Sequence, residues 1–243
     1  GNTLSGAIPP VAGNVRYWFE STLESGGTVV TPRDAPANTF GFHAGPLEIV
    51  WFEDFESPLD WTSGGPGDDW QIGAPQGLGG DPATAYSGSG VLGNRLDGDG
   101  LYVPDADTWI ESPPIDCRRC KGALLQFRRF GKVQQAVSDR VTAGIGTIPV
   151  WQNDPGLFFD EASLDDPLWS FQEYDVSELA DGGANIRIRF TLQSDNFLEF
   201  GGLTLDDVAL VMPPDGGRGG SGGGLFGCGC SVAPDARPSL FPS

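Results

Sequence analysis

The sequence predicts an all-β protein whose main part is a jelly-roll β-sandwich. The chain has 37 glycines and 20 prolines among its 243 residues. Both residue types are costly inside helices, so long helices are excluded. Hydrophobic residues make up 39% of the chain, which is enough to build a buried core. Short apolar stretches separated by Gly, Pro and Asp then favour a sandwich of many short strands.

Residues 1–46 are expected to form a small β-segment. Apolar and polar side chains alternate over 14–21, which predicts a half-buried strand, and 28–31 and 38–43 supply two more. Three strands do not make a stable sandwich alone. The segment therefore resembles the last part of an immunoglobulin-like or fibronectin-like module, or it is a β-extension that packs on the main domain.

Residues 47–212 are expected to form the main domain. Its predicted strands are 47–55, 109–112, 123–130, 139–145, 169–175, 185–192 and 203–212. The alternation over 184–190 is strict, so apolar side chains should face the core, while Arg187 and Arg189 lie on a face that is either solvated or paired.

The composition changes after Met212. A Gly-rich linker follows, then the Gly-Cys-Gly-Cys stretch that contains Cys228 and Cys230, and then a tail rich in Pro and Ser. Because the linker offers few side chains that could pack, 213–243 are expected to be disordered.

The charge of the chain excludes several partners. A formal net charge of −19 repels a phosphate backbone, so nucleic acid is not an expected ligand. Anionic membrane surfaces are disfavoured for the same reason. The single histidine, His43, leaves no three-histidine or histidine-pair zinc site, and no nucleophile motif is present. We therefore expect the chain not to be an enzyme.

The main domain carries an ordered series of motifs. They are 52–56, Trp61, 69–75, 85–93, 96–102, 110–116, 124–127, Trp169 with 174–177, 186–190 and 205–208. In this order they resemble the MAM-like jelly-roll modules, of galactose-binding-like shape, of bacterial secreted peptidases. There such modules lie at the C-terminal end of the immune inhibitor A and zinc carboxypeptidase types. The likeness covers about 50–212, and 151–166 departs from it as an insertion.

The tail has a resemblance of its own. A Gly-rich linker before Cys228 and Cys230 is similar to a myxobacterial-type C-terminal sorting tail, although the hydrophobic helix and basic cluster of such tails are not present. The resemblance implies that both cysteines are processed or lipidated and that membrane attachment occurs only through this tail. It also implies an extracellular or outer-surface location in a Gram-negative bacterium.

Acidic side chains suggest a structural Ca²⁺ site. Asp54 and Glu56 are two residues apart on a strand and so share a face. The resemblance implies that the first and last strands run side by side with calcium near their ends, which would add Asp207. Asp97 and Asp99 with their glycines resemble a shortened calcium loop. The alternative is that these residues only form turns.

Two cysteines lie within the main domain. Cys117 and Cys120 have the spacing of redox or zinc motifs, but zinc would need a second pair. In an exported chain a local disulfide is the simpler interpretation.

A basic cluster surrounds these cysteines and the strand that follows. It consists of Arg118, Arg119, Lys121, Arg128, Arg129 and Lys132. Such clustering either binds an acidic ligand or pairs with carboxylates on a solvated sheet face. The second interpretation is favoured.

Five tryptophans are candidates for sugar-stacking platforms: Trp61, Trp70, Trp109, Trp151 and Trp169. For Trp61, Trp70 and Trp169 the motif match favours the core. Trp151 is followed by Gln152, Asn153 and Asp154 in the insertion, so it is the best candidate for an exposed ligand-binding residue.

These observations predict a non-catalytic accessory module of an exported, surface-anchored protein. Its expected partner is a glycan or a protein on a cell-envelope surface, with calcium stabilising the fold. One alternative is a structural spacer without a ligand. The other is the C-terminal part of a secreted metallopeptidase whose catalytic domain lies upstream.

Overall fold

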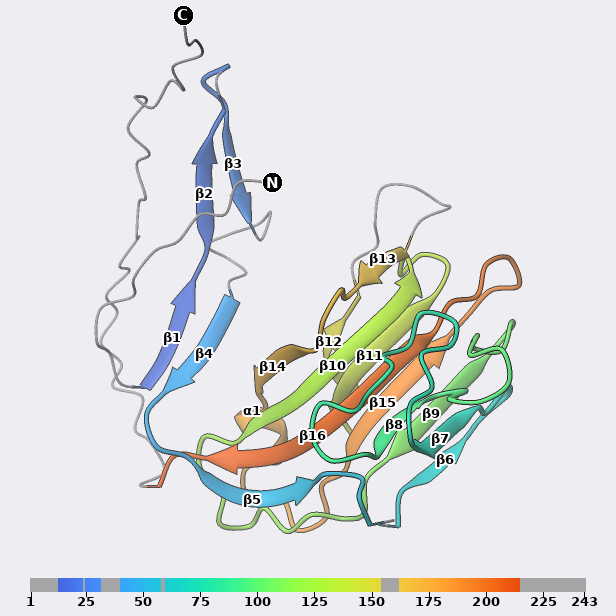
Figure 1. Cartoon of the computed structure of the whole chain (residues 1–243). Coiled ribbons are helices and arrows are strands. Elements are labelled where there is room, and N and C mark those ends of the chain that lie inside the picture. The colour runs from blue at the N-terminus through green and yellow to red at the C-terminus, as the bar shows by residue number, and fades with distance from the viewer. Residues whose placement is uncertain (1–12, 24, 32–39, 58–59, 154–161, 215–243) are drawn as a thin grey trace, which may run out of the picture. The chain divides into compact units, whose positions relative to one another are not determined.

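The computed structural model describes residues 13–23, 25–31, 40–57, 60–153 and 162–214. These residues belong to two compact units, and the chain passes from the first to the second between Gly45 and Pro46. The regular structure is almost entirely β (Figure 1), and the one helix among the described residues is the single turn α1 (Ser177–Ala180). The all-β prediction is therefore confirmed.

The N-terminal unit contains two antiparallel strand pairs. β1 (Gly13–Tyr17) pairs with β4 (Phe40–Ala44), and β2 (Phe19–Thr22) pairs with β3 (Thr28–Thr31). The strand expected over 14–21 is thus two strands, interrupted at Trp18. Kinship with an immunoglobulin-like or fibronectin-like module stays a prediction.

The main unit contains a seven-stranded antiparallel sheet. Its central strands are β10 (Leu124–Gln134) and β16 (Gly202–Met212), which run side by side through the unit in Figure 1. The other strands are β5 (Glu48–Glu53), β7 (Trp70–Gly73), β8 (Val91–Asn94), β13 (Ala162–Asp165) and β14 (Ser170–Asp175). The sheet order is β13-β10-β16-β8-β7, with β14 also paired to β10 and β5 to β16.

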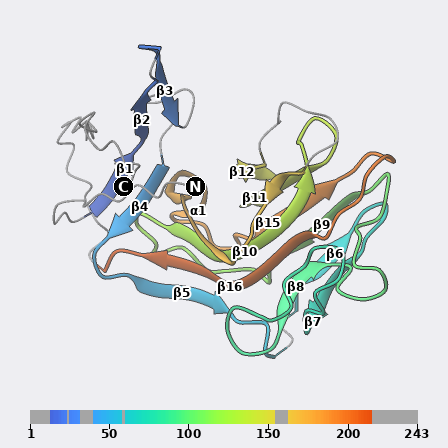
Figure 2. The same ribbon diagram turned by 45° about the horizontal axis from the view of Figure 1, so that its top comes forward.

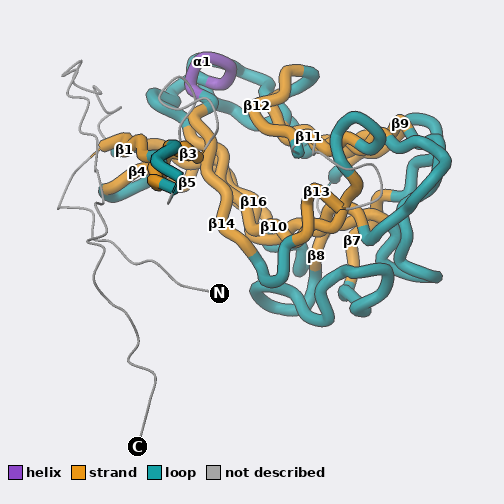
Figure 3. The backbone as a smooth tube through the Cα atoms, turned by 90° about the horizontal axis from the view of Figure 1, so that it is seen from above, coloured by secondary structure: helices purple, strands orange, loops and turns teal. Residues whose placement is uncertain are grey.

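A five-stranded antiparallel sheet forms the second layer. Its strands are β6 (Thr62–Gly64), β9 (Asp107–Glu111), β11 (Arg140–Ile145), β12 (Ile148–Gln152) and β15 (Ile188–Gln193). They lie in the order β12-β11-β15-β9-β6. The view from above in Figure 3 and the tilted view in Figure 2 show the two sheets as separate layers.

The core lies between the two layers. Phe127 of β10 and Phe190 of β15 meet edge to face with ring centroids 5.4 Å apart, which joins the sheets. Both side chains are fully buried in one continuous cluster. Strand side chains alternate between faces, so the neighbours of Phe127 and Phe190 in the sequence point to the outer faces. Those outer faces carry the polar and aromatic groups considered below.

A disulfide closes the turn between β9 and β10. Cys117 and Cys120 are bonded, with Cα atoms 4.9 Å apart, and both side chains are buried. The backbone of this turn is tied to the segment after α1, because Cys117 N donates to Gly183 O at 2.8 Å. The bond and the burial of both side chains fit the local disulfide that the sequence favoured.

Replacing Cys117 and Cys120 with alanine should lower the free energy of unfolding by about 2 kcal/mol. The chain-entropy relation gives this value for the short loop that the bond closes. Urea unfolding of oxidised protein, reduced protein and the double variant measures it. Reductant should not shift the midpoint of the double variant, and equal midpoints for all three samples would contradict the prediction.

Candidate functional site

The predicted ligand-binding residue Trp151 lies on β12, on the inner side of the five-stranded sheet. It pairs in register with Ala143, a fully buried residue of β11, so its ring turns toward the core. The side chain is half-buried and packs against the main cluster. The Cζ of Arg129 lies 4.8 Å from the ring centroid. The expectation of an exposed platform is therefore wrong, because the core and a cation cover the ring.

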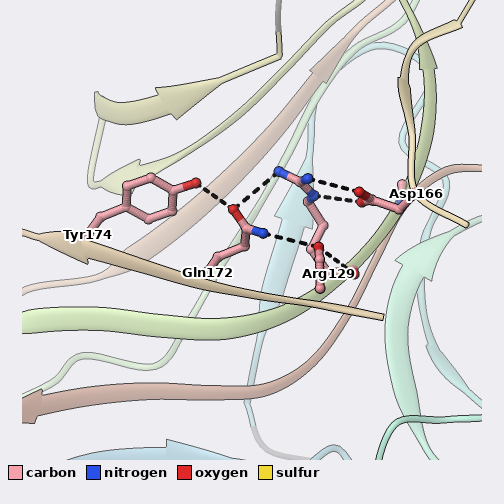
Figure 4. Close-up of polar contacts among 6 residues, drawn as sticks. Arg129, Asp166, Gln172 and Tyr174 are labelled. Carbon is pink, nitrogen blue, oxygen red and sulfur yellow. Dashed lines mark hydrogen bonds and ion pairs between the residues drawn. The ribbon is translucent and has the colours of Figure 1, made fainter. Parts of the chain in front are cut away.

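Arg129 belongs to a polar network that reaches Tyr174 (Figure 4). Its Nε and Nη2 donate to the two oxygens of Asp166 at 2.7 and 3.0 Å, and Nη1 donates to Gln172 Oε1 at 3.3 Å. The Tyr174 hydroxyl donates to the same Gln172 oxygen at 2.8 Å. Burial raises the pKa of Tyr174. The network connects β10, β14 and the segment after β13, and its contacts are those of a structural brace.

Replacing Trp151 with alanine should lower the free energy of unfolding by about 2–4 kcal/mol, because it opens a cavity beside the core. Thermal and urea unfolding measure the change. Phe197→Ala is the matched control, since that aromatic side chain is 70% exposed and should cost little. A Trp151 variant as stable as wild type would restore the exposed-platform interpretation.

Two of the predicted calcium ligands, Glu56 and Asp207, bind one loop, residues 84–90. Glu56 accepts hydrogen bonds from the backbone N–H groups of Ser89 and Gly90, both at 2.6 Å, and these bonds lower its pKa. Asp207 accepts from Ser87 Oγ at 2.8 Å. Asp54 accepts from the Glu56 N–H at 3.1 Å. Glu56 and Asp207 therefore hold the loop directly.

The neighbouring Asp206, which the calcium prediction did not include, holds the same loop. It is fully buried and accepts from the N–H groups of Tyr86 and Ser87 at 2.9 and 3.0 Å. Burial raises its pKa to about 6. Consecutive strand residues normally face opposite sides. Here the ladder shifts register opposite β10, and Asp207 has a φ of 46°, which lets both aspartates reach one loop.

The other two predicted ligands lie in a different turn. Asp97 accepts from Gln71 Nε2 at 3.1 Å, and Asp99 forms an exposed ion pair with Arg95 at 3.4 Å. Among the described residues, no three acidic, histidine or cysteine side chains are grouped so that they could hold a metal ion. The five carboxylates therefore do not fit a common calcium site, and calcium stabilisation stays a prediction from the sequence.

The outward face of the five-stranded sheet presents a row of cross-strand polar pairs. Glu111 and Arg189 form an ion pair at 3.0 Å, and both are half-buried. Two positions further along β15, the hydroxyl of Thr191 forms a hydrogen bond with the hydroxyl of Thr142, with 2.7 Å between the oxygens. The next pair on this face is Gln193 with Asp107, at 3.0 Å between Nε2 and Oδ1. The strand period of two places all of these side chains on one surface.

Trp109 lies in the middle of this row. It pairs in register with Thr191 of β15 and Gly64 of β6. A Cβ atom at Gly64 would come within 3.1 Å of the indole ring, so the glycine makes room for the ring beside β6. The Arg189 Cζ lies 4.4 Å from the ring centroid. Trp109 is half-buried and thus keeps part of its surface in solvent.

A small hollow of about 30 Å³ lies beside this row. It is lined by Thr142, Gly144, Gly146, Thr147, Pro149, Arg189 and Thr191. Gly144 is close to the neighbouring strand, because a Cβ there would be 2.1 Å from Ile148 O. Hydroxyl groups and a guanidinium around a shallow hollow can exchange hydrogen bonds with a polyhydroxylated ligand. We call this surface, defined by Trp109, Glu111, Thr142, Arg189, Thr191 and Gln193, the Trp109 face.

The sequence indicated only part of this surface. The strict alternation over 184–190 correctly placed Arg187 and Arg189 away from the core, where Arg187 Nη1 donates to Ser112 O at 2.7 Å. Trp109 is among the five candidate sugar-stacking platforms, but the sequence favours Trp151 because of its polar neighbours in the insertion. The structure places Trp109 on the outward face, because its sequence neighbours Thr108 and Ile110 are buried on the core side of β9.

The remaining residues singled out in the sequence lie outside the main unit or outside the described residues. His43 lies in the N-terminal unit, where its Nδ1 is 2.9 Å from Asn14 Oδ1. Cys228 and Cys230 lie outside the described residues, so the sorting-tail prediction is not tested. In the described ranges no helix has the length and hydropathy of a membrane span.

One curated protein is similar in sequence. The chain is 30% identical over 213 residues to bacillopeptidase F of Bacillus subtilis (strain 168). The match covers 86% of this chain but only 14% of that protein, so the chain spans about a seventh of the length of its relative. No protein-family model matches the sequence.

Solved structures give more distant similarities. The K1 cleaved adhesin domain of Lys-gingipain from Porphyromonas gingivalis W83 is 17% identical, with a TM-score of 0.44, over 70% of this chain and 99% of that one. TmCBM61 in complex with β-1,4-galactotriose is 10% identical, with a TM-score of 0.38, over 66% and 91%. Similarities at this level do not identify a function.

Proposed function

We propose that the main unit is a non-catalytic accessory module of an exported bacterial protein and that it binds glycan through the Trp109 face. The observation that carries this proposal is the row of polar pairs around the half-buried Trp109. An indole offers an apolar surface to the C–H face of a sugar, and fixed polar side chains beside it offer hydrogen bonds to hydroxyl groups. Because cross-strand contacts already fix these side chains, binding costs little further ordering.

The similarity to a short part of bacillopeptidase F supports an accessory place within a larger peptidase. A module that retains its parent on a polymer raises the effective concentration of that parent at the surface. Weak affinity at a single site is therefore sufficient for this role. Anchoring through Cys228 and Cys230 and location at the outer surface of a Gram-negative cell belong to the same proposal.

Affinity electrophoresis in gels that contain soluble polysaccharides tests the proposal. Wild type should be retarded by at least one polysaccharide, and Trp109→Ala should lose most of that retardation. Gln193→Ala, which changes another residue of the Trp109 face, should also weaken the retardation. Phe197→Ala is the control, since it removes an exposed aromatic side chain outside the Trp109 face.

The melting temperature of each variant must be measured beside its retardation. Loss of retardation in a Trp109 variant that still folds supports the proposal. Wild type that migrates unchanged in every polysaccharide, and is not retained by cell-envelope material, would favour the spacer alternative. Retention that survives in Trp109→Ala would place the binding surface elsewhere.

A further inference from the structure

Arg128 occupies an unusual position on the outward face of the seven-stranded sheet. It lies on β10 and pairs in register with Phe171 of β14 on one side and Asp206 of β16 on the other. Its Cζ is 4.2 Å from the ring centroid of Tyr86 and 4.8 Å from that of Phe171. Two aromatic side chains from opposite sides of the strand therefore hold one guanidinium.

Both rings are open to solvent. Tyr86 is 45% exposed and Phe171 is 47% exposed, and neither is part of the core. Trp169 supports Tyr86 with an edge contact at 6.4 Å between centroids, and its Nε1 donates to Thr84 O at 3.1 Å. The result is an exposed aromatic patch with a cation in it, which we call the Arg128 patch: Tyr86, Arg128, Trp169 and Phe171.

Within the described part of the chain, the guanidinium of Arg128 has no anionic partner. Among the described residues its side chain makes no ion pair and no hydrogen bond. The next residue, Arg129, is by contrast bound by both oxygens of Asp166. In the register, the carboxylate across from Arg128 is that of Asp206, which is buried and bound to the N–H groups of Tyr86 and Ser87. Among the described residues, a half-buried guanidinium therefore stands without a counter-charge, on a chain with a net charge of −19.

The backbone that presents Tyr86 is firmly held. Three carboxylates, those of Glu56, Asp206 and Asp207, accept hydrogen bonds from the loop that carries it. Glu56 lies in the segment after β5, which ends at Glu53 and therefore does not contain Asp54 and Glu56 as expected, and the two aspartates lie at the bulge in β16. The ring is thus fixed above Arg128 before any partner arrives, which lowers the entropy lost on binding.

We propose that the Arg128 patch docks an acidic segment of a partner protein. A carboxylate of that segment would bind the Arg128 guanidinium, and an adjacent apolar side chain would rest against Tyr86 and Phe171. Ring contacts use the faces of a guanidinium, whereas its N–H donors lie in its plane. Stacking therefore leaves the donors free for a bidentate carboxylate, which is a strong and directional contact.

A protein partner fits this patch better than a sugar does. The guanidinium beside Trp109, that of Arg189, already has Glu111 as its counter-ion, whereas Arg128 makes no ion pair among the described residues. A carboxylate therefore gains more at the Arg128 patch than a neutral sugar does. Tyr, Trp and Arg together are the residues that dominate protein–protein interfaces. The patch lies on the other sheet from the Trp109 face, so this proposal is independent of the proposed glycan binding.

Selection from a phage-displayed library of random dodecapeptides tests the proposal. The full chain is the target, and peptides that also bind Arg128→Gln are removed. The enriched peptides should contain Asp or Glu next to an aliphatic or aromatic residue. Their dissociation constants, measured by calorimetry with synthetic peptides, should rise about ten- to hundredfold for Arg128→Gln. Arg128→Lys should retain part of the affinity, because it keeps the charge but loses the bidentate geometry.

Two controls separate the patch from a folding effect. Arg128→Gln should melt within a few degrees of wild type, and Phe171→Ala should weaken the same peptides without removing the charge. Replacing the acidic residue of a selected peptide by its amide should abolish binding. No enrichment over Arg128→Gln, or enrichment of peptides without acidic residues, would overturn the proposal. Arg128-dependent binding of oligogalacturonate without any selected peptide would also overturn it, in favour of an acidic polysaccharide.

Discussion

Replacing Arg129 with methionine should lower the free energy of unfolding by about 3–5 kcal/mol. The side chains of Arg129 and Asp166 are 11% and 13% exposed, so the ion pair is largely shielded from water. Without the guanidinium, Asp166 keeps only the Gly131 N–H, at 3.1 Å, as a side-chain partner among the described residues. A buried carboxylate without its counter-charge is one of the most costly defects in a folded protein. Urea unfolding at neutral pH measures the loss.

The double variant Arg129→Met and Asp166→Leu separates the pair from its surroundings. Removing both charges should recover most of the stability, since apolar replacements of a buried ion pair are often neutral. Arg119→Met is the matched single control, because Arg119 is exposed and should change stability little. If Arg129→Met is as stable as the Arg119 variant, the brace between β10, β14 and the segment after β13 contributes nothing.

The strands that were predicted from sequence are the long, strongly apolar ones. β10, β11, β14, β15 and β16 all occur where alternation or apolar runs placed them. β6, β7 and β8 were missed because each has only three or four residues and contains or adjoins glycine. Such short strands have too little periodicity to detect, and they form because neighbouring strands supply their hydrogen bonds.

The site residues were harder to predict for three physical reasons. The face of Trp151 is set by its pairing with Ala143, which no local pattern reveals. Asp206 and Asp207 reach one loop only because β16 contains a bulge. The basic cluster was interpreted as a solvated face, and this holds for Arg118, which pairs with Asp116 in solvent. Arg129 lies instead between the sheets, and Arg128 has no carboxylate among the described residues.

The carboxylates near residues 84–90 show why acidic clusters mislead. Their spacing suggested ligands that need a cation to relieve repulsion. In the structure, backbone N–H groups of a glycine- and serine-rich loop fill the same role for Glu56 and Asp206. A carboxylate gains charge-assisted bonds from such donors without any metal. The sequence contains both the acids and the loop, but only the fold shows that they meet.

Lowering the pH from 8 to 5 should stabilise the protein by roughly 3–5 kcal/mol. Burial raises the pKa of Asp81 to about 7 and the pKa values of Asp139 and Asp206 to about 6. In the unfolded chain these carboxyl groups titrate near their ordinary value of 3.8. Between those limits the folded state holds protons that the unfolded state has lost. The contribution of these three groups to the free energy of unfolding is therefore fully present below about pH 4. It is lost as the pH rises toward 7.

Asp81 should account for the largest share of this dependence. One of its oxygens accepts from Thr204 Oγ1 at 3.1 Å, while the other is buried without a partner among the described residues. Asp81→Asn removes the charge and keeps the acceptor for Thr204. The variant should gain stability relative to wild type at pH 8 and show a flatter pH profile. Asp165→Asn is the control, since that side chain is 62% exposed and should leave the profile unchanged.

Thermal melts and urea unfolding at half-unit steps from pH 4 to pH 8 measure the profile. The net charge of −19 adds a general repulsion at high pH. Asp81→Asn and Asp165→Asn each remove one negative charge, so they change this repulsion equally. The difference between these two variants therefore isolates the buried group. Parallel profiles for Asp81→Asn and Asp165→Asn would show that Asp81 titrates as an exposed carboxylate and that burial does not control its charge.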